Sequence, residues 1–449
     1  MFLVNNIFFT IYIYILYFAS YLSVNIQKAK KMVRKIKTKI STTFRALKQR
    51  NFRLFFTGQS ISLIGSWIQN IAMSWLIYTL TKSAFMMGMI TFINALPNMF
   101  VTPIAGVIID RVNKYKLLIW LQSFFLLQAL LLAILTLLGV ISVWHIIVIG
   151  LLTNLTAAFD MPLRQAIVIN LVDNPRDLSN AISLNSTNFN LARLLGPAIA
   201  GILIAKFSEG ICFLINAISY IAVIWALLLI HIELPPKERL KKNDFLPSLI
   251  EGIKYAKDTP PIRLLLLTLT FVSFIGISYP LLMPIFVDEI LKGDARTLGI
   301  LMSTSGVGAL VASLILATRQ KNKDLSMYLF GGSLSFGCSF VGIGLTENIF
   351  VASAMMFCLG FGMVLGLIAC NTMLQQIVDD DKRGRIMSLY TVAFIGTVPW
   401  GNLFAGSIAH WIGIVPTFGM LGTMLIIAAC IYQHYAKKIS FASYIQISD

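Results

Sequence analysis

The chain has 449 residues, of which 57% are hydrophobic and 12% are charged, and its mean hydropathy is +0.81. Because ordinary globular chains carry about 25% charged residues, this composition excludes a soluble domain and indicates a membrane protein. The five cysteines lie in apolar runs and form no CxxC pair. We therefore predict neither a disulfide framework nor a metal site or other cofactor.

The first segment, residues 1–31, is apolar between Ile7 and Val24 and is followed by a basic stretch. No basic residue precedes the apolar run, so it is a poor signal peptide. Two alternatives remain open: the run is an additional span, or Met32 is the true start and the preceding residues are upstream sequence. We expect a chain that begins at Met32 to insert and function like the full chain, because no later span is lost.

Beyond Asn51, apolar runs of transmembrane length recur along the chain. A membrane-spanning helix needs about 20 apolar residues. Twelve runs meet this requirement: 54–79, 84–109, 117–138, 141–160, 184–206, 211–232, 263–287, 298–317, 328–345, 350–374, 389–411 and 416–435. The chain is therefore predicted to be an all-α polytopic membrane protein with twelve transmembrane helices.

The connecting loops alternate between short, nearly uncharged loops and basic loops. Of the 36 Lys and Arg residues, 31 lie on the side of the basic loops, and one, Arg193, lies inside a span. The others lie on the opposite side: Lys82, Lys206, Lys292 and Arg296. By the positive-inside rule the basic side is cytoplasmic, as are both ends of the twelve-span core. The net charge of +17 thus describes orientation in a bilayer and not a nucleic-acid partner.

The longest polar loop divides the spans into two sets of six that share a sequence pattern. At a constant offset of 205, four residues match four others: Leu184, Gly196, Ala200 and Gly201 match Leu389, Gly401, Ala405 and Gly406. Such a repeat predicts two six-helix pseudo-repeated bundles around a central path. The predicted parts are a basic cytoplasmic N-terminus (32–53), an N-terminal bundle (54–232), a cytoplasmic linker (233–262) with an amphipathic surface helix, a C-terminal bundle (263–435) and a cytoplasmic tail (436–449).

Polar side chains inside the spans recur at helical spacing. They are costly in a bilayer, so they face the bundle interior or a cavity. Six of them are our candidates for the translocation path or for ion coupling: Gln59, Ser62, Gln69, Asp160, Asn190 and Arg193. Arg193 needs an anion or water, and Asp160 is the nearest acid by helix order. Alternatively, Asp160 pairs with Arg164 one turn on, and the uncharged side chains join neighbouring helices by hydrogen bonds.

Sequence motifs of enzymes are absent. The chain has no G-x-x-x-x-G-K-[ST] motif, which excludes ATP hydrolysis through a P-loop. The acidic run Asp379–Asp381 has no second acidic cluster with which to hold magnesium for a prenyl transfer. We predict no catalytic residues and no enzyme activity.

The loop between the second and third spans carries a recognisable signature. In "AGVIIDRVNKYKLLIW", Gly106 is followed by Asp110 and Arg111 and then by Lys114 and Lys116. This pattern resembles the loop signature of the major facilitator superfamily. The stretches "FDMPLRQAIVINLVDNPRDLSNAISLNSTNFNLARLLGPAIAG" and "GSWIQNIAMSWLIYTLTKSA" are similar to the bacterial branch that contains the enterobactin exporter.

The resemblance extends from Arg45 to about Tyr435, and it has two departures. Asn113 stands where the signature usually has a glycine, and the matching loop of the second half, "ATRQKNKDL", lacks the glycine and the aspartate. Because the resemblance begins near Arg45, it favours Met32 as the true start.

The resemblance implies a major facilitator fold and a gating role for the signature loop. Asp110 would hold the cytoplasmic gate shut against the start of the eleventh span, with Arg164 as its basic partner. Gly106 would let the second and eleventh spans approach closely. Alternatively, the three basic residues of the loop only supply positive charge for orientation.

The expected function is secondary active transport by alternating access. The simplest form is proton-driven efflux of a small amphipathic compound, a drug, siderophore or metabolite, by a monomer in the bacterial cell (inner) membrane. The expected partners are therefore a small-molecule substrate, protons and lipid. Two alternatives remain open: an uncoupled uniporter or importer on the same fold, or a non-transporting membrane sensor or scaffold.

Overall fold

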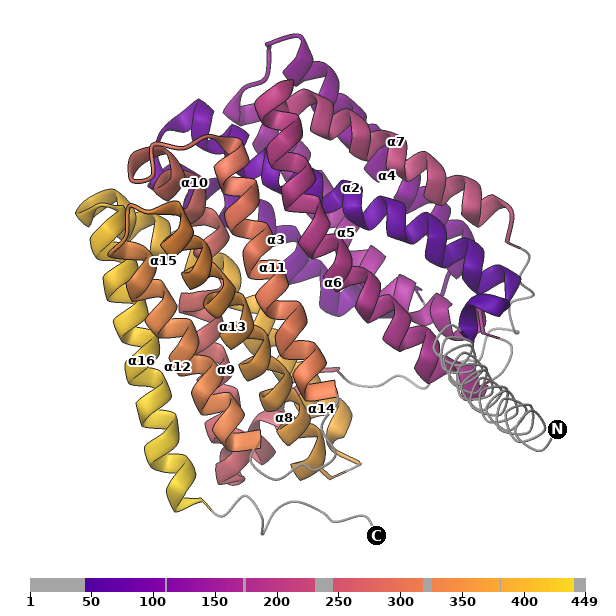
Figure 1. Ribbon diagram of the computed structural model, residues 1–449. Coiled ribbons are helices and arrows are strands. Elements are labelled where there is room, and N and C mark those ends of the chain that lie inside the picture. Colours follow the sequence, from indigo (N-terminus) through magenta and orange to yellow (C-terminus); the bar gives the residue numbers. More distant parts are fainter. Residues whose placement is uncertain are drawn as a thin grey trace, which may run out of the picture.

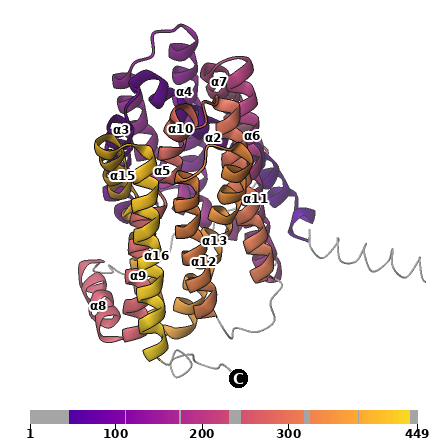
Figure 2. The same ribbon diagram turned by 60° about the vertical axis from the view of Figure 1, so that its left-hand side comes forward.

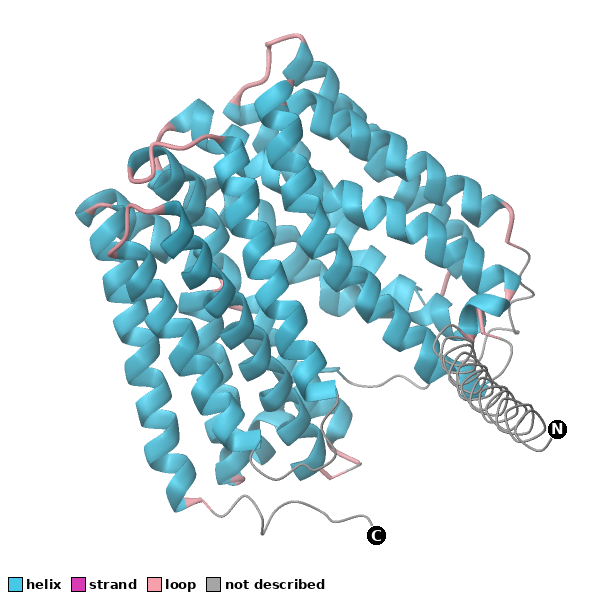
Figure 3. Cartoon of the chain, in the orientation of Figure 1, coloured by secondary structure: helices cyan, strands magenta, loops and turns pink. Residues whose placement is uncertain are grey.

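The computed structural model describes residues 45–109, 111–172, 175–230, 245–317, 325–379 and 381–439. These residues form helices joined by short turns, and no β-strand occurs among them (Figure 3). The expectations for the N-terminal segment, for Asp110, for most of the polar linker and for the C-terminal tail lie outside the described residues.

Six long helices form the first bundle. They are α2 (Arg50–Thr81), α3 (Ala84–Ile109), α4 (Lys114–Leu137), α5 (Val143–Asn170), α6 (Pro175–Lys206) and α7 (Glu209–Leu228). A short 3-10 turn, η1 (Ala46–Lys48), precedes α2. The carboxamide oxygen of Asn113 accepts the backbone N–H groups of Tyr115 and Lys116 at 3.1 and 3.0 Å. The residue that departs from the resembled signature therefore caps the third span.

The second bundle contains two broken spans. Its helices are α9 (Pro260–Gly276), α10 (Tyr279–Glu289), α11 (Ala295–Ala317), α12 (Leu325–Gly344), α13 (Ile349–Ile377), α14 (Arg383–Thr391), α15 (Val398–Ile412) and α16 (Ile414–Lys438). α9 and α10 are the two parts of the seventh span, which breaks at Ile277–Ser278 ahead of Pro280. α14 and α15 are parts of the eleventh span, joined by the π-helical turn η2 (Val392–Gly396).

The described helices account for all twelve predicted spans. Eleven segments are long and apolar enough to cross a bilayer, and α2 completes the set with 32 residues. The predicted polar loop between the fourth and fifth spans is wrong in extent, since α5 continues to Asn170 and α6 already begins at Pro175. Hydropathy locates only the apolar part of a helix, whereas these helices extend by several polar turns beyond it.

Two seams join the bundles, and both lie toward the same end of the molecule (Figure 1). We call the end where α2 begins and α16 ends the basic end, and the other the opposite end. In the first seam α6 packs on α11, and a Cβ atom on Gly201 would lie 3.0 Å from the Cα atom of Gly299. In the second seam α3 packs on α15, and a Cβ atom on Gly406 would lie 3.1 Å from the Cα atom of Gly88. Glycine is required at these positions because the two backbones meet directly.

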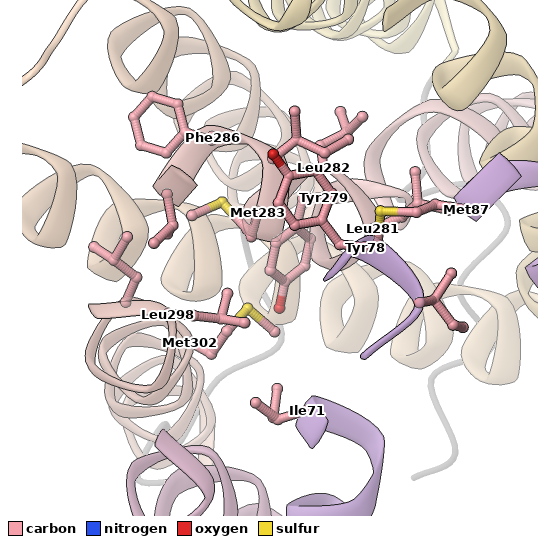
Figure 4. Close-up of a cluster of buried hydrophobic side chains, with 14 of the residues drawn as sticks. Ile71, Tyr78, Met87, Tyr279, Leu281, Leu282, Met283, Phe286, Leu298 and Met302 are labelled. Carbon is pink, nitrogen blue, oxygen red and sulfur yellow. The ribbon is translucent and has the colours of Figure 1, made fainter. Parts of the chain in front are cut away.

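An apolar cluster fills the space between the seams at the opposite end. Figure 4 shows Ile71, Tyr78 and Met87 of the first bundle near side chains of α10 and α11. The second bundle contributes Leu281, Leu282, Met283, Phe286, Leu298 and Met302, all buried. The opposite end is therefore closed, while the bundles diverge toward the basic end (Figure 1).

The linker contributes one described helix, α8 (Phe245–Asp258), at the basic end (Figure 2). The carboxylate of Glu251 lies 2.7 Å from the guanidinium of Arg385 at the start of α14. The amphipathic helix expected in the linker therefore exists, and it packs on the second bundle.

Candidate functional site

Arg193, well inside α6, joins the two bundles. Its Nη2 atom donates to the hydroxyl of Tyr279 at 3.3 Å, and this hydroxyl lies 3.3 Å from Ser305 Oγ. Tyr279 is the first residue of α10, directly after the break in the seventh span. Arg193 lies about 20 Å along α6 from Lys206, and the apolar core of a bilayer is about 30 Å thick. The charge that the sequence places inside a span thus faces the other bundle.

The expected pair between Arg193 and Asp160 is not formed. Asp160 instead accepts from Arg164 Nε at 2.5 Å, one turn along α5, and from Gln122 of α4 at 2.8 Å. Arg164 Nη2 donates to the Gln122 side-chain oxygen at 3.1 Å, which closes a three-residue cluster inside the first bundle. The alternative pairing of Asp160 is therefore the one observed. Helix order in the sequence could not separate the two, because it does not fix the rotation of α6.

The polar face of α2 is turned toward α7. Gln69 accepts from Asn216 at 2.7 Å, and Ser66 lies 3.3 Å from the hydroxyl of Tyr220. Ser62 is buried on the same face. In this structure Gln69 and Ser62 lie on the face of α2 that meets α7, and their expected role along the translocation path stays a prediction. Gly65 allows this close contact, since a Cβ atom at its position would lie only 2.5 Å from Ser219 Oγ.

For two other predicted path residues, Gln59 and Asn190, the structure records no hydrogen bond to the second bundle. Gln59 is buried in the first bundle, and its Oε1 atom has no hydrogen-bond partner among the described residues. Asn190 donates to the backbone oxygen of Ser186 on its own helix at 3.0 Å. Of the six predicted path residues, Arg193 is the one that the structure brings to the other bundle.

Aromatic rings border the second seam. Phe92 of α3 and Trp400 of α15 lie 4.8 Å apart in an edge-to-face arrangement across the seam. Phe274 of α9 lies 5.3 Å from Phe404. The sequence analysis did not single out these residues, because an aromatic residue in an apolar span has no distinguishing periodicity.

An ion pair at the opposite end was also missed. Asp288 of α10 accepts from Tyr78 at 2.6 Å and from Lys82 at 2.9 Å, and both donors belong to the first bundle. Lys82 adopts a left-handed conformation (φ 45°) at the end of α2, which turns its backbone after the last helical residue. The sequence did contain a signal for this pair. Lys82 and Asp288 carry opposite charges and lie next to the ends of the first and seventh spans, which occupy matching places in the two six-span halves.

The signature loop is described only in part. Gly106 lies in the last turns of α3, Arg111 and Lys116 are exposed, and Lys114 begins α4. Because Asp110 lies outside the described residues, the expected contact with Arg164 stays a prediction.

At the start of the eleventh span, Asp379 accepts from Tyr255 of α8 at 3.1 Å and from Lys382 at 3.4 Å. Burial, together with the hydrogen bond to Asp379, raises the pKa of Tyr255, and the same carboxylate raises the pKa of Lys382.

The chain is similar to several curated bacterial transporters over most of its length. It is 27% identical over 388 residues to the staphyloferrin A transporter of Staphylococcus aureus, covering 86% of this chain and 96% of that one. It is 22% identical over 395 residues to macrolide efflux protein A of Streptococcus pyogenes, with the same coverage of 86% and 96%. The multidrug efflux pump Tap of Mycolicibacterium fortuitum is also 22% identical, covering 79% of this chain and 88% of that one.

Solved structures have the same fold. A bacterial homologue of the human lysosomal transporter Spinster in an inward-facing state matches with a TM-score of 0.68 and 15% identity, covering 89% of this chain and 98% of that one. A bacterial homologue of the iron transporter ferroportin, also inward-facing, matches with a TM-score of 0.67 and 15% identity, covering 87% and 98%. The sequence profile of the transmembrane secretion effectors matches residues 41–443. Together with the twelve spans and the two bundles joined at one end, this match shows that the chain belongs to the transmembrane secretion effector family of major facilitator superfamily transporters.

Proposed function

We propose that the protein exports a small amphipathic compound by alternating access, driven by the proton gradient, with its basic end in the cytoplasm. The observation that carries this proposal is the one-sided closure: both seams and the apolar cluster lie toward the opposite end. A rocking transporter requires a state in which the substrate path is open to one side only. With the basic end in the cytoplasm, this conformation would receive substrate from inside the cell.

Asp160 is the proposed proton carrier. Among the described carboxylates that form ion pairs, it lies furthest inside a span, about 15 Å along α5 from Asn170. Its bonds to Arg164 and Gln122 would change on protonation, because a neutral carboxyl no longer balances the guanidinium.

The second candidate function is export without proton coupling, and it is supported by the same pair of Asp160 and Arg164. A carboxylate that stays paired with Arg164 throughout the cycle would take up no proton, and transport would then follow the substrate gradient alone.

Inside-out vesicles that contain the full chain test the proposal. Energised vesicles should accumulate members of a panel of amphipathic compounds, and a protonophore should abolish the accumulation. Asp160→Asn should lose accumulation and retain exchange of substrate across the membrane. Accumulation that a protonophore leaves unchanged would reject proton coupling, and the absence of any transported compound would reject the export function.

A further inference from the structure

Arg193 lies next to the point where the first seam gives way to the diverging bundles. A Cβ atom on Gly306 of α11 would lie 3.1 Å from both the backbone oxygen of Arg193 and the Cα atom of Leu194, so the helices still touch there. One and two turns closer to the basic end, the side chains of Phe189 and Ser186 are exposed. Arg193 itself is half-buried. Arg193 therefore lies where the recorded contact between α6 and α11 ends, on the side of the basic end.

The guanidinium of Arg193 has no counter-ion among the described residues. Two carboxylates of the first bundle are paired elsewhere, Asp160 with Arg164 and Asp177 with Arg45. Glu209 lies beyond the far end of α6, at the first residue of α7. Asp288 of the second bundle is paired with Lys82. Of the five N–H donors of the guanidinium, the described residues receive one bond, at the Tyr279 hydroxyl.

This arrangement holds the guanidinium in place without neutralising it. Tyr279 is 4% exposed, and its hydroxyl contacts Ser305, which is fully buried. A charge inside a span is costly, so it is retained where it faces water or an anion. The planar guanidinium is suited to carboxylate and phosphate groups, to which it can donate two parallel hydrogen bonds.

The second seam, the other contact between the bundles, carries aromatic surface. Trp400 packs on Phe92 there and is 47% exposed. The two seams thus offer one cation and an aromatic surface, which together suit a molecule with an anionic head and an apolar body.

We propose that Arg193, held by Tyr279, binds the carboxylate or phosphate group of the transported compound, and that the substrate is an amphipathic organic anion. That the bound anion is the transported compound rests on the proposed function, whereas anion binding at Arg193 does not depend on transport. Arg193 is also a specificity-determining residue in this account, because a neutral or cationic compound of equal shape leaves the guanidinium without its partner.

Matched compounds on one naphthalene skeleton test the proposal. The probes are 1-naphthoate, 1-naphthamide and 1-naphthylmethylammonium, and binding to the purified full chain is measured by calorimetry in a lipid-free non-ionic detergent. A charge-assisted pair predicts that the chain binds the naphthoate about ten- to a hundredfold more tightly than the amide. Equal binding of the three probes would overturn the proposal, and so would tighter binding of the ammonium compound.

Variants assign the preference to Arg193. Arg193→Gln should remove the preference for naphthoate and leave amide binding unchanged, while Arg193→Lys should keep part of it. Tyr279→Phe should weaken naphthoate binding less than Arg193→Gln and serves if the glutamine variant does not fold. Lys437→Gln removes an exposed charge at the end of α16 and should change nothing. A preference that persists in Arg193→Gln, or survives unchanged in both Arg193→Lys and Tyr279→Phe, would overturn the site.

The same probes in inside-out vesicles separate this inference from the proposed function. Accumulation of naphthoate but not of the amide supports both. Arg193-dependent binding without accumulation of any probe or panel compound leaves the anion site standing and rejects export. Accumulation of panel compounds irrespective of their charge, with no effect of Arg193→Gln, leaves export standing and rejects the anion site.

Discussion

Arg164 donates from Nε to Asp160 and from Nη2 to Gln122, while its Nη1 atom is buried without a partner among the described residues. The pair is largely withdrawn from water, with 19% of the Arg164 side chain and 15% of the Asp160 side chain exposed. Each charge therefore depends on the other more than a surface pair would.

Removing one partner of this pair should destabilise the protein more than removing both. Breaking a buried pair costs about 3–5 kcal/mol, and the partial exposure here favours the lower value. We expect Asp160→Leu and Arg164→Leu to lower the thermal unfolding temperature in detergent, followed by tryptophan fluorescence. The double substitution should regain much of the loss, whereas Glu347→Leu at an exposed site should have little effect. The pairing would be contradicted if the unfolding temperature of the double variant fell by as much as the sum of the decreases in the two single variants.

At the opposite end, Asp288 holds Tyr78 and Lys82 of the first bundle. The pair is open to solvent, with 58% of the Lys82 side chain and 39% of the Asp288 side chain exposed, so its contribution is modest, about 0.2–1 kcal/mol. This amount shifts a balanced equilibrium between two states by a factor of about 1.4 to 5.

Asp288→Asn should favour opening of the opposite end. A cysteine placed at Met302 in the apolar cluster should then react faster with a membrane-impermeant maleimide from that side. The same cysteine in the parent chain is the control, together with Glu347→Gln at an exposed position in the turn between α12 and α13. Equal labelling rates in all three chains would show that Asp288 does not help to keep the opposite end closed.

Among the helices, the repeat found in the sequence has a direct structural meaning. Gly201 and Gly406, which match at the offset of 205, occupy equivalent places in the two seams. A Cβ atom on Gly201 would lie 2.8 Å from the backbone oxygen of Ala295, the first residue of α11, and one on Gly406 would lie 2.5 Å from that of Ala84, the first residue of α3. The shared glycines are thus contact points between bundles.

Gly406→Ala should therefore impair closure of the second seam. The added methyl group meets backbone, which cannot move aside as a flexible side chain would. We expect reduced transport in vesicles and faster labelling of the cysteine at Met302. Gly419→Ala on α16 is the matched control, because a Cβ atom there has no neighbour within 4 Å and alanine favours the helix. Equal transport by the two variants would show that the seam tolerates the extra volume.

The number and order of the spans could be predicted because each needs a long apolar run, and the two bundles could be predicted from the repeat. The breaks at Ile277–Ser278 and Val392–Gly396 were not predicted, because a single Pro or a π-helical turn leaves the hydropathy of a span unchanged. The site was predicted only in part. Arg193 was identified because charge inside a span is rare, whereas the partner of Gln69 depends on which neighbour the helix face meets.

At the scale of the whole molecule, the bundles are joined at one end and apart at the other (Figure 1). Alternating access by rocking requires the two ends to change in opposite directions. Residues Phe100 on α3 and Val392 at the start of η2 are exposed on the basic-end side of the second seam. Residues Trp144 on α5 and Phe350 on α13 are exposed at the opposite end, one in each bundle.

Spin labels at these positions should report opposite distance changes. When the equilibrium is moved toward the other state, by substrate or by a change in pH, the distance between labels at Phe100 and Val392 should shorten. The distance between labels at Trp144 and Phe350 should lengthen, and a pair within one bundle, at Trp144 and Trp225, should not change. Pulsed electron–electron double resonance measures all three distances, and changes of equal sign at both ends would exclude rocking.

The glycine contacts of the seams also bear on how fast the molecule can work. Where Gly201 meets Gly299 and Gly88 meets Gly406, backbone touches backbone, and no interlocked side chain has to change its rotamer before the helices separate. Little apolar surface is uncovered at these points, so the activation barrier there is low. Resistance to opening is concentrated in the apolar cluster between the seams, whose bulky side chains must lose their neighbours. Turnover should therefore respond to the size of Met302 or Phe286, and it should respond to the seams only where a substitution adds volume between the two backbones, as Gly406→Ala does.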